Sequence, residues 1–163
     1  MDTFRENVRK TQQSIDEGDI EDGKCQELAV KLIRYINHML KQGVFTQIEQ
    51  TDYLKQMEAL CETLFQNARD KLTPECYECL VNRITDLKEY DRAELWGTRF
   101  FKQYPDVLAS YTLRLKIYFE TSRMDEFFAV LDELCASSVP VDSKTLELIR
   151  MIQQDPDKDR REK

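Results

Sequence analysis

Apolar residues recur at steps of three and four along this chain, which is the spacing that places them on one face of an α-helix. The broadest stripe runs from residue 25 to residue 40 and stops before Gly43. A narrower stripe precedes it, at Phe4, Val8, Thr11 and Ile15. The pattern predicts two N-terminal helices joined by an acidic link, and it leaves open whether the first stripe closes onto its own chain or onto a second copy.

A third helix is expected to begin at Thr46. The segment Thr46-Gln47-Ile48-Glu49 has the form of a capping box, in which hydroxyl and carboxylate accept from each other's backbone amides. The apolar stripe that follows continues to Leu72. Because the link from the second helix is short, the second and third helices should form a long antiparallel hairpin.

From Thr73 onward the expected helices are shorter. Thr73 is placed to cap the next helix, with Pro74 at its first position, where no amide donor is needed. The periodicity predicts helices over 74–88, 91–103, 106–121, 123–137 and 142–153, with Asp91 and Asp142 as caps. The fold class is therefore all-α with about eight helices, and the charged residues 154–163 are expected to be a disordered tail.

The helix pattern repeats itself between Tyr77 and Pro140. Ala93 and Phe127 are separated by 127 − 93 = 34 residues. The same interval separates Tyr77 from Tyr111 and Ile84 from Tyr118, while Pro105 and Pro140 differ from it by one residue. An interval of this length predicts stacked helical hairpins.

Residues Tyr77, Leu80, Ile84, Tyr90, Ala93 and Pro105 resemble the signature of a tetratricopeptide repeat. The second unit keeps Tyr111 and Tyr118 but has Phe127 where that family has Ala. The resemblance implies an α-solenoid of antiparallel hairpins that holds a protein or peptide. The expected organisation is residues 1–72 with the long hairpin, residues 73–153 as tetratricopeptide-like hairpins packed on it in one globular unit, and the tail.

The repeat register implies a groove lined by the first helix of each unit. Its residues would be Glu75, Glu78, Asn82, Thr85, Asp86, Thr112, Lys116, Phe119 and Glu120. Glu75, Glu78 and Asp86 share one side of a helix that shows no designated basic neighbour on that face. The groove is therefore expected to bind a basic or amphipathic peptide or helix.

The second unit also resembles a pentatricopeptide repeat, because Ser110-Tyr111-Thr112-Leu113 opens it and Val139-Pro140-Val141-Asp142 closes it. That resemblance implies an RNA-associated regulatory role as the alternative. A single such unit reads little RNA, and the net charge of 24 − 31 = −7 disfavours phosphate backbones.

Composition adds two expectations. Charged residues make up 34% of the chain, and four Gly and four Pro leave few turn formers, which favours long helices. No window approaches the roughly 18 apolar residues that a membrane helix needs. The chain is expected to be cytoplasmic and to have no membrane partner.

The five cysteines, Cys25, Cys61, Cys76, Cys79 and Cys135, are all expected on apolar helix faces as reduced core thiols. Only Cys76 and Cys79 have a spacing that fits chemistry, which makes a thiol or zinc sensor the remaining alternative. His38 is the sole histidine, and no nucleophile elbow, phosphate loop or zinc helix motif occurs. No enzymatic activity, cofactor or metal is therefore expected.

Trp96, Phe100, Phe101 and Tyr104 form an aromatic cluster on one predicted helix. Trp96 and Phe101 point to different sides of that helix, so one side is buried by a neighbouring hairpin or by a partner, and Trp96 and Phe101 are candidate interface residues. The function that the sequence favours is a scaffold or adaptor for another protein, with a homo-oligomer left open.

Overall fold

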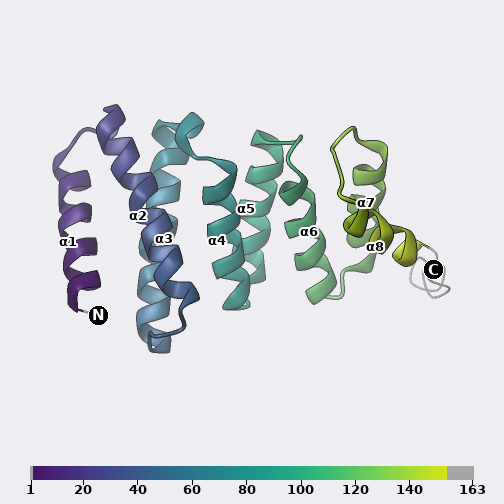
Figure 1. Cartoon of the computed structure of the whole chain (residues 1–163), viewed down its shortest axis with the longest axis horizontal. Coiled ribbons are helices and arrows are strands. Elements are labelled where there is room, and N and C mark those ends of the chain that lie inside the picture. The colour runs from purple at the N-terminus through teal and green to yellow at the C-terminus, as the bar shows by residue number, and fades with distance from the viewer. Residues whose placement is uncertain (1, 154–163) are drawn as a thin grey trace. The chain divides into compact units, whose positions relative to one another are not determined.

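The computed structural model describes residues 2–153, and this part of the chain is helical without strands (Figure 1). The elements are α1 (Asp2–Glu17), α2 (Gly23–Lys41), α3 (Gln47–Asn67), a short 3-10 turn (Arg69–Lys71), α4 (Pro74–Asp86), α5 (Tyr90–Gln103), α6 (Leu108–Glu120), α7 (Met124–Ala136) and α8 (Ser143–Gln153). The all-α class and the eight helices are confirmed for these residues. No helix among them is long and apolar enough to span a bilayer. The predicted tail at 154–163 lies outside the described residues.

The helices gather into two compact units that divide between Lys88 and Glu89. The sequence placed a boundary after residue 72 instead. The unit boundary falls later because α4 packs on α2 and α3. The first predicted tetratricopeptide hairpin, α4 with α5, therefore has its two helices in different units, and the solenoid register stays a prediction.

In the first unit, α2 and α3 run antiparallel, with α1 packed on α2 and α4 packed on both (Figure 1). Ile33, Ile36, Met57 and Leu64 fill the space between the helices and are fully buried. The N-terminal stripe closes onto its own chain, because Phe4, Val8 and Ile15 are buried within this unit.

Phe4 fixes the start of α1 among three other rings. Its ring centroid lies 5.0 Å from that of Tyr35, 5.1 Å from that of Tyr53 and 5.4 Å from that of Phe45. Such tilted and edge-on aromatic pairs add about 0.5–1.5 kcal/mol each beyond the burial of their area. Nearby, the Arg5 guanidinium lies 2.5 Å from the Glu49 carboxylate at the start of α3.

Three predicted helix starts are confirmed. The Thr46 hydroxyl accepts from the Glu49 amide at 3.2 Å, and the Glu49 carboxylate accepts from the Thr46 amide at 3.2 Å, which completes the capping box. The Thr73 hydroxyl accepts from the Cys76 amide at 3.3 Å, with Pro74 in the first turn. The Asp142 carboxylate likewise accepts from the Thr145 amide at 3.3 Å, as expected of a cap.

Two predicted boundaries are wrong. The third helix ends at Asn67, because Ala68 leaves the helical conformation at φ −150° and a 3-10 turn follows. Leu72 is nevertheless fully buried, which explains why the apolar pattern continues past the helix end. The fifth helix starts at Tyr90, so Asp91 lies in its first turn and does not cap it.

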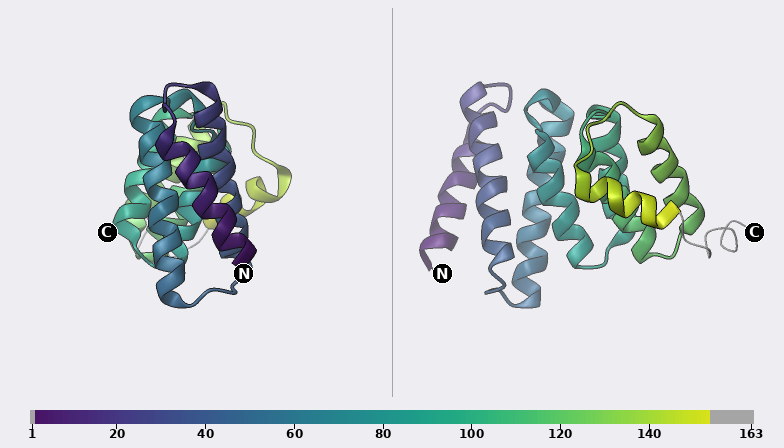
Figure 2. Two further views of the ribbon diagram at one scale, coloured as in Figure 1. Left: turned by 90° about the vertical axis from the view of Figure 1, so that its left-hand side faces the viewer. Right: turned by 45° about the vertical axis from the view of Figure 1, so that its right-hand side comes forward.

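In the second unit, α5, α6 and α7 alternate in direction, and α6 packs on both of its neighbours (Figures 1 and 2). Gly97 is buried where α5 faces α6, and a β-carbon at this position would make ordinary van der Waals contacts, 3.5 Å from Arg114 Cγ and 3.7 Å from Ile117 Cδ1. Val130, Leu131 and Leu134 bury the inner face of α7.

Candidate docking groove

An apolar groove of about 290 Å³ lies in the second unit, between α6, α7 and α8. It is lined by Thr112, Leu115, Lys116 and Phe119 of α6, Phe127 and Leu131 of α7, and Thr145, Leu148, Ile149 and Ile152 of α8. The right-hand view of Figure 2 shows α8, in yellow, running across the direction of the other helices of this unit. Lys116 is the only charged side chain among these lining residues.

The groove has a buried floor and exposed walls. Phe127 and Ile149 are 6% and 5% exposed, whereas Phe119 is 62% and Leu148 51% exposed. The rings of Phe119 and Phe127 lie 6.0 Å apart, so the exposed ring continues the buried surface. Helix α8 exposes Leu146 and Met151 as well. Large apolar side chains gathered in one place, in contrast to single exposed ones, are typical of an interaction surface.

This groove differs from the predicted one, which the first helices of the two repeat units would share, but three of the predicted residues lie in it. Thr112, Lys116 and Phe119 were predicted as groove residues and do line it. Glu120 does not line it. Burial of Tyr90, followed by the nearby Glu120 carboxylate, raises the pKa of Tyr90. The residues of α8 were missed because the repeat register considers only the first helix of each hairpin. The signal was present, since α8 carries apolar residues on more than one side.

The acidic half of the predicted groove lies on α4, in the first unit, and it does have basic neighbours. The Arg34 guanidinium lies 2.9 Å from the Glu75 carboxylate, and the Arg83 guanidinium lies 3.2 Å from that of Asp86. The expectation of carboxylates without basic neighbours is therefore wrong for these two. Burial, followed by the nearby Glu75, raises the pKa of Glu78.

Two further α4 residues differ in their exposure. Thr85 is 5% exposed and its hydroxyl donates to the Val81 carbonyl at 2.7 Å, so it does not face a groove. Asn82 is half-buried. Because α4 and α6 belong to different units, a groove that they share stays a prediction.

The candidate interface aromatics divide between core and surface. Trp96 is 1% exposed and offers no surface to a partner. Phe101 is half-buried, with its ring 5.2 Å from that of Tyr111 and the Arg114 guanidinium 4.7 Å from its centroid. Phe101 therefore contributes mainly to the packing of α5 against α6.

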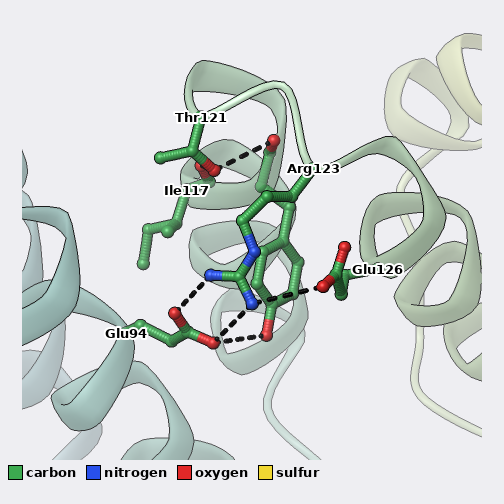
Figure 3. A network of polar contacts seen from close by, with 6 residues as sticks. Glu94, Ile117, Thr121, Arg123 and Glu126 are labelled. Carbon is green, nitrogen blue, oxygen red and sulfur yellow. Dashed lines mark hydrogen bonds and ion pairs between the residues drawn. The ribbon is translucent and has the colours of Figure 1, made fainter.

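A polar clamp joins α5, α6 and α7 inside the second unit (Figure 3). The Arg123 guanidinium donates to both oxygens of Glu94, at 2.5 and 3.1 Å, and to Glu126 at 3.4 Å. The Tyr118 hydroxyl donates to Glu94 at 3.2 Å, and Arg123 also lies over the Tyr118 ring. Hydrogen bonds from Arg123, more than any other contact, hold the pKa of Glu94 below its usual range. Both oxygens of Glu94 accept hydrogen bonds, so the clamp stabilises the packing of α5, α6 and the start of α7.

None of the five cysteines, all within the described residues, is in a disulfide, and Cys25, Cys61 and Cys76 are buried. Cys61 of α3 lies near both Cys76 and Cys79, and burial raises the pKa of Cys61 far above its ordinary value. Burial also raises the pKa of Cys79 to about 11. Cys135 is exposed, which corrects the expectation that every thiol lies on a buried face. Within residues 2–153, no group of three or more His, Cys, Asp or Glu side chains is arranged to hold a metal ion.

The exposure of each thiol, together with the raised pKa values of Cys61 and Cys79, predicts the order in which the thiols react. Alkylation needs the thiolate, so Cys79, with its pKa of about 11, should react slowly with iodoacetamide at pH 8 and faster as the pH approaches 11. Exposed Cys135 should be labelled first, and Cys61 only after unfolding. Peptide mass spectrometry after timed alkylation measures this order. Rapid labelling of Cys79 at pH 7 would instead favour the thiol sensor.

The chain matches no protein-family model, no curated protein and no solved structure. The tetratricopeptide and pentatricopeptide resemblances therefore remain predictions from the sequence.

Proposed function

We propose that the chain is a protein interaction module, a scaffold or adaptor, that docks the apolar face of an amphipathic helix in the groove of α6, α7 and α8. The observation that carries this proposal is the pair of exposed apolar walls, Phe119 and Leu148, over the buried floor at Phe127. A helix presents apolar side chains at steps of three and four, and these fit a groove formed by helices.

The charge of the groove favours an amphipathic partner over a basic one. Lys116 is the charged side chain of the lining, so it pairs with a carboxylate on the polar side of the docked helix. The acidic face that suggested a basic ligand lies on α4, where Glu75 and Asp86 are already paired with arginines.

Three observations disfavour an RNA-binding protein, a thiol sensor and an acid–base enzyme. RNA binding needs several basic and stacking side chains along one face, and the chain has a net charge of −7. A thiol sensor needs an accessible thiolate, and burial raises the pKa values of Cys61, Cys76 and Cys79. Acid–base catalysis would need titratable partners, and the groove lining contains only Lys116.

A displayed library of amphipathic helical peptides tests the proposal. Peptides selected on the full chain should lose at least about tenfold in affinity for F119E or L148E, because each change places a charge in a desolvated contact. L95E is the matched control, since Leu95 is 50% exposed in α5 and does not line the groove. Titration by fluorescence anisotropy gives the affinities.

The selection also tests the charge assignment. Selected peptides should carry an acidic residue beside the apolar face, and K116E should weaken them. Peptides that bind F119E, L148E and L95E equally well would remove the groove from consideration.

A further inference from the structure

A second cavity, of about 700 Å³, lies in the first unit, where the C-terminal half of α1 and the link after it face α2 and α3. Its volume is within the range of about 300–1,000 Å³ that is common for small-molecule sites. None of the residues around it belongs to the docking groove, so its role is independent of the proposed function.

One wall of this cavity is apolar. Ile15 of α1, Ala29 of α2 and Leu60 of α3 contribute to it, and each is at most 7% exposed. These side chains give the cavity an apolar lining that an aliphatic stem can lie against.

A chain of hydrogen bonds crosses the cavity from α3 to α1. The Gln56 side-chain amide donates to the Gln12 carbonyl oxygen at 2.9 Å, and the Gln12 amide donates to the Asp16 carboxylate at 2.9 Å. The chain orients Asp16 at the cavity. A carboxylate has room for several donors, so Asp16 still accepts from a ligand.

The charged residues around the cavity are both acidic. Asp16 and Asp19 are the charged side chains of its lining, which contains no Lys, Arg or His. Behind them, burial and the carboxylates of Asp22, Asp19 and Asp16 raise the pKa of Cys25, which lies against the Ile15 carbonyl. These carboxylates give the cavity a negative potential that attracts cations.

We propose that this cavity binds an aliphatic ammonium ion, with the ammonium group between Asp16 and Asp19 and the alkyl chain against Ile15, Ala29 and Leu60. An ammonium group supplies donors for the two carboxylates, and its alkyl stem covers the apolar wall. A bare metal ion would leave the apolar wall uncovered, and an aliphatic carboxylate would be repelled by both aspartates.

Calorimetric titration of the full chain with n-hexylammonium tests the proposal. Binding should be saturable at millimolar concentrations and weaken by at least about tenfold in the D16N/D19N double variant, because the charge-assisted contacts are lost while the size is kept. Hexanoate should not bind. D132N is the matched control, since Asp132 is exposed in α7 and distant in sequence from the cavity residues.

A second variant tests the shape of the cavity without changing its charge. Ala59 is exposed on α3 and lines the cavity, so A59F should fill part of it and weaken n-hexylammonium by a similar factor while circular dichroism stays unchanged. A free amine and a lysine side chain share this chemistry. Titration with Nα-acetyl-lysine methylamide separates the two. Binding comparable to that of n-hexylammonium would indicate a lysine side chain as the ligand, and selective binding of n-hexylammonium would indicate a free amine.

Three outcomes would overturn the proposal. They are no saturable binding of n-hexylammonium to the folded chain, equal binding by D16N/D19N and the unchanged chain, and binding of hexanoate as tight as that of n-hexylammonium.

Discussion

Replacing Ala93 by Trp should destabilise the chain by about 1–3 kcal/mol or more, because the new ring has no space in a close-packed site. Ala93 is fully buried in α5. Ala129→Trp is the matched control, because Ala129 is exposed in the middle of α7 in the same unit. The control loses only helix propensity, which is about 0.5 kcal/mol.

Urea denaturation followed by circular dichroism gives the midpoint and the slope of the unfolding transition for both variants. The Ala93 variant should unfold at clearly lower urea than the Ala129 variant. Equal midpoints would mean that the position of Ala93 is not closely packed, and they would also count against the repeat register in which Ala93 marks the crossing of two helices.

Arg123→Gln should destabilise the second unit by about 1–2 kcal/mol, after allowance for the partial exposure of the clamp. The change removes the paired hydrogen bonds to Glu94 and leaves a carboxylate that is 28% exposed without its guanidinium. Arg150→Gln is the matched control, because Arg150 is an exposed residue of α8. Thermal melts at pH 7 compare the two.

The loss of stability that Arg123→Gln causes should depend on pH. The pKa of Glu94 is lower in the folded chain than its ordinary 4.5, so the stability that the clamp contributes is complete above the unfolded pKa and is lost as the pH falls through the folded pKa. The difference between the unchanged chain and the variant should therefore be largest near neutral pH and shrink below about pH 4.5. A difference that is constant from pH 7 to pH 3 would show that Arg123 acts through packing and not through its charge.

Local rules were enough to predict the helix starts that Thr46, Thr73 and Asp142 cap. Thr46 with Glu49, and Thr73 with Pro74, satisfy their own neighbouring amides, so the sequence within one turn determines the geometry. The end of α3 was not predictable in this way. Ala68 and Leu72 are buried in a turn as they would be in a helix, and an apolar pattern reports burial and not backbone conformation.

The groove could be predicted only in part for a related reason. The spacing of apolar residues within α6 was enough to predict Thr112, Lys116 and Phe119. The opposite wall is formed by α8, and its place depends on the path of the chain after α7. The pairing of Arg34 with Glu75 joins positions 41 residues apart, and no local pattern indicates it. Those two gaps explain why the sequence left both a basic and an amphipathic ligand open, whereas the proposed function rests on the apolar groove of α6, α7 and α8.

Glu49 makes two contacts with one carboxylate. It closes the capping box with Thr46 and also pairs with Arg5, and the Thr46 backbone amide, ahead of Arg5, holds the pKa of Glu49 below its usual range. The first turn of α3 and the attachment of α1 therefore share this carboxylate and are energetically coupled. Because the pKa of Glu49 is lowered by both contacts, acid that protonates this carboxylate weakens the cap of α3 and the attachment of α1 together.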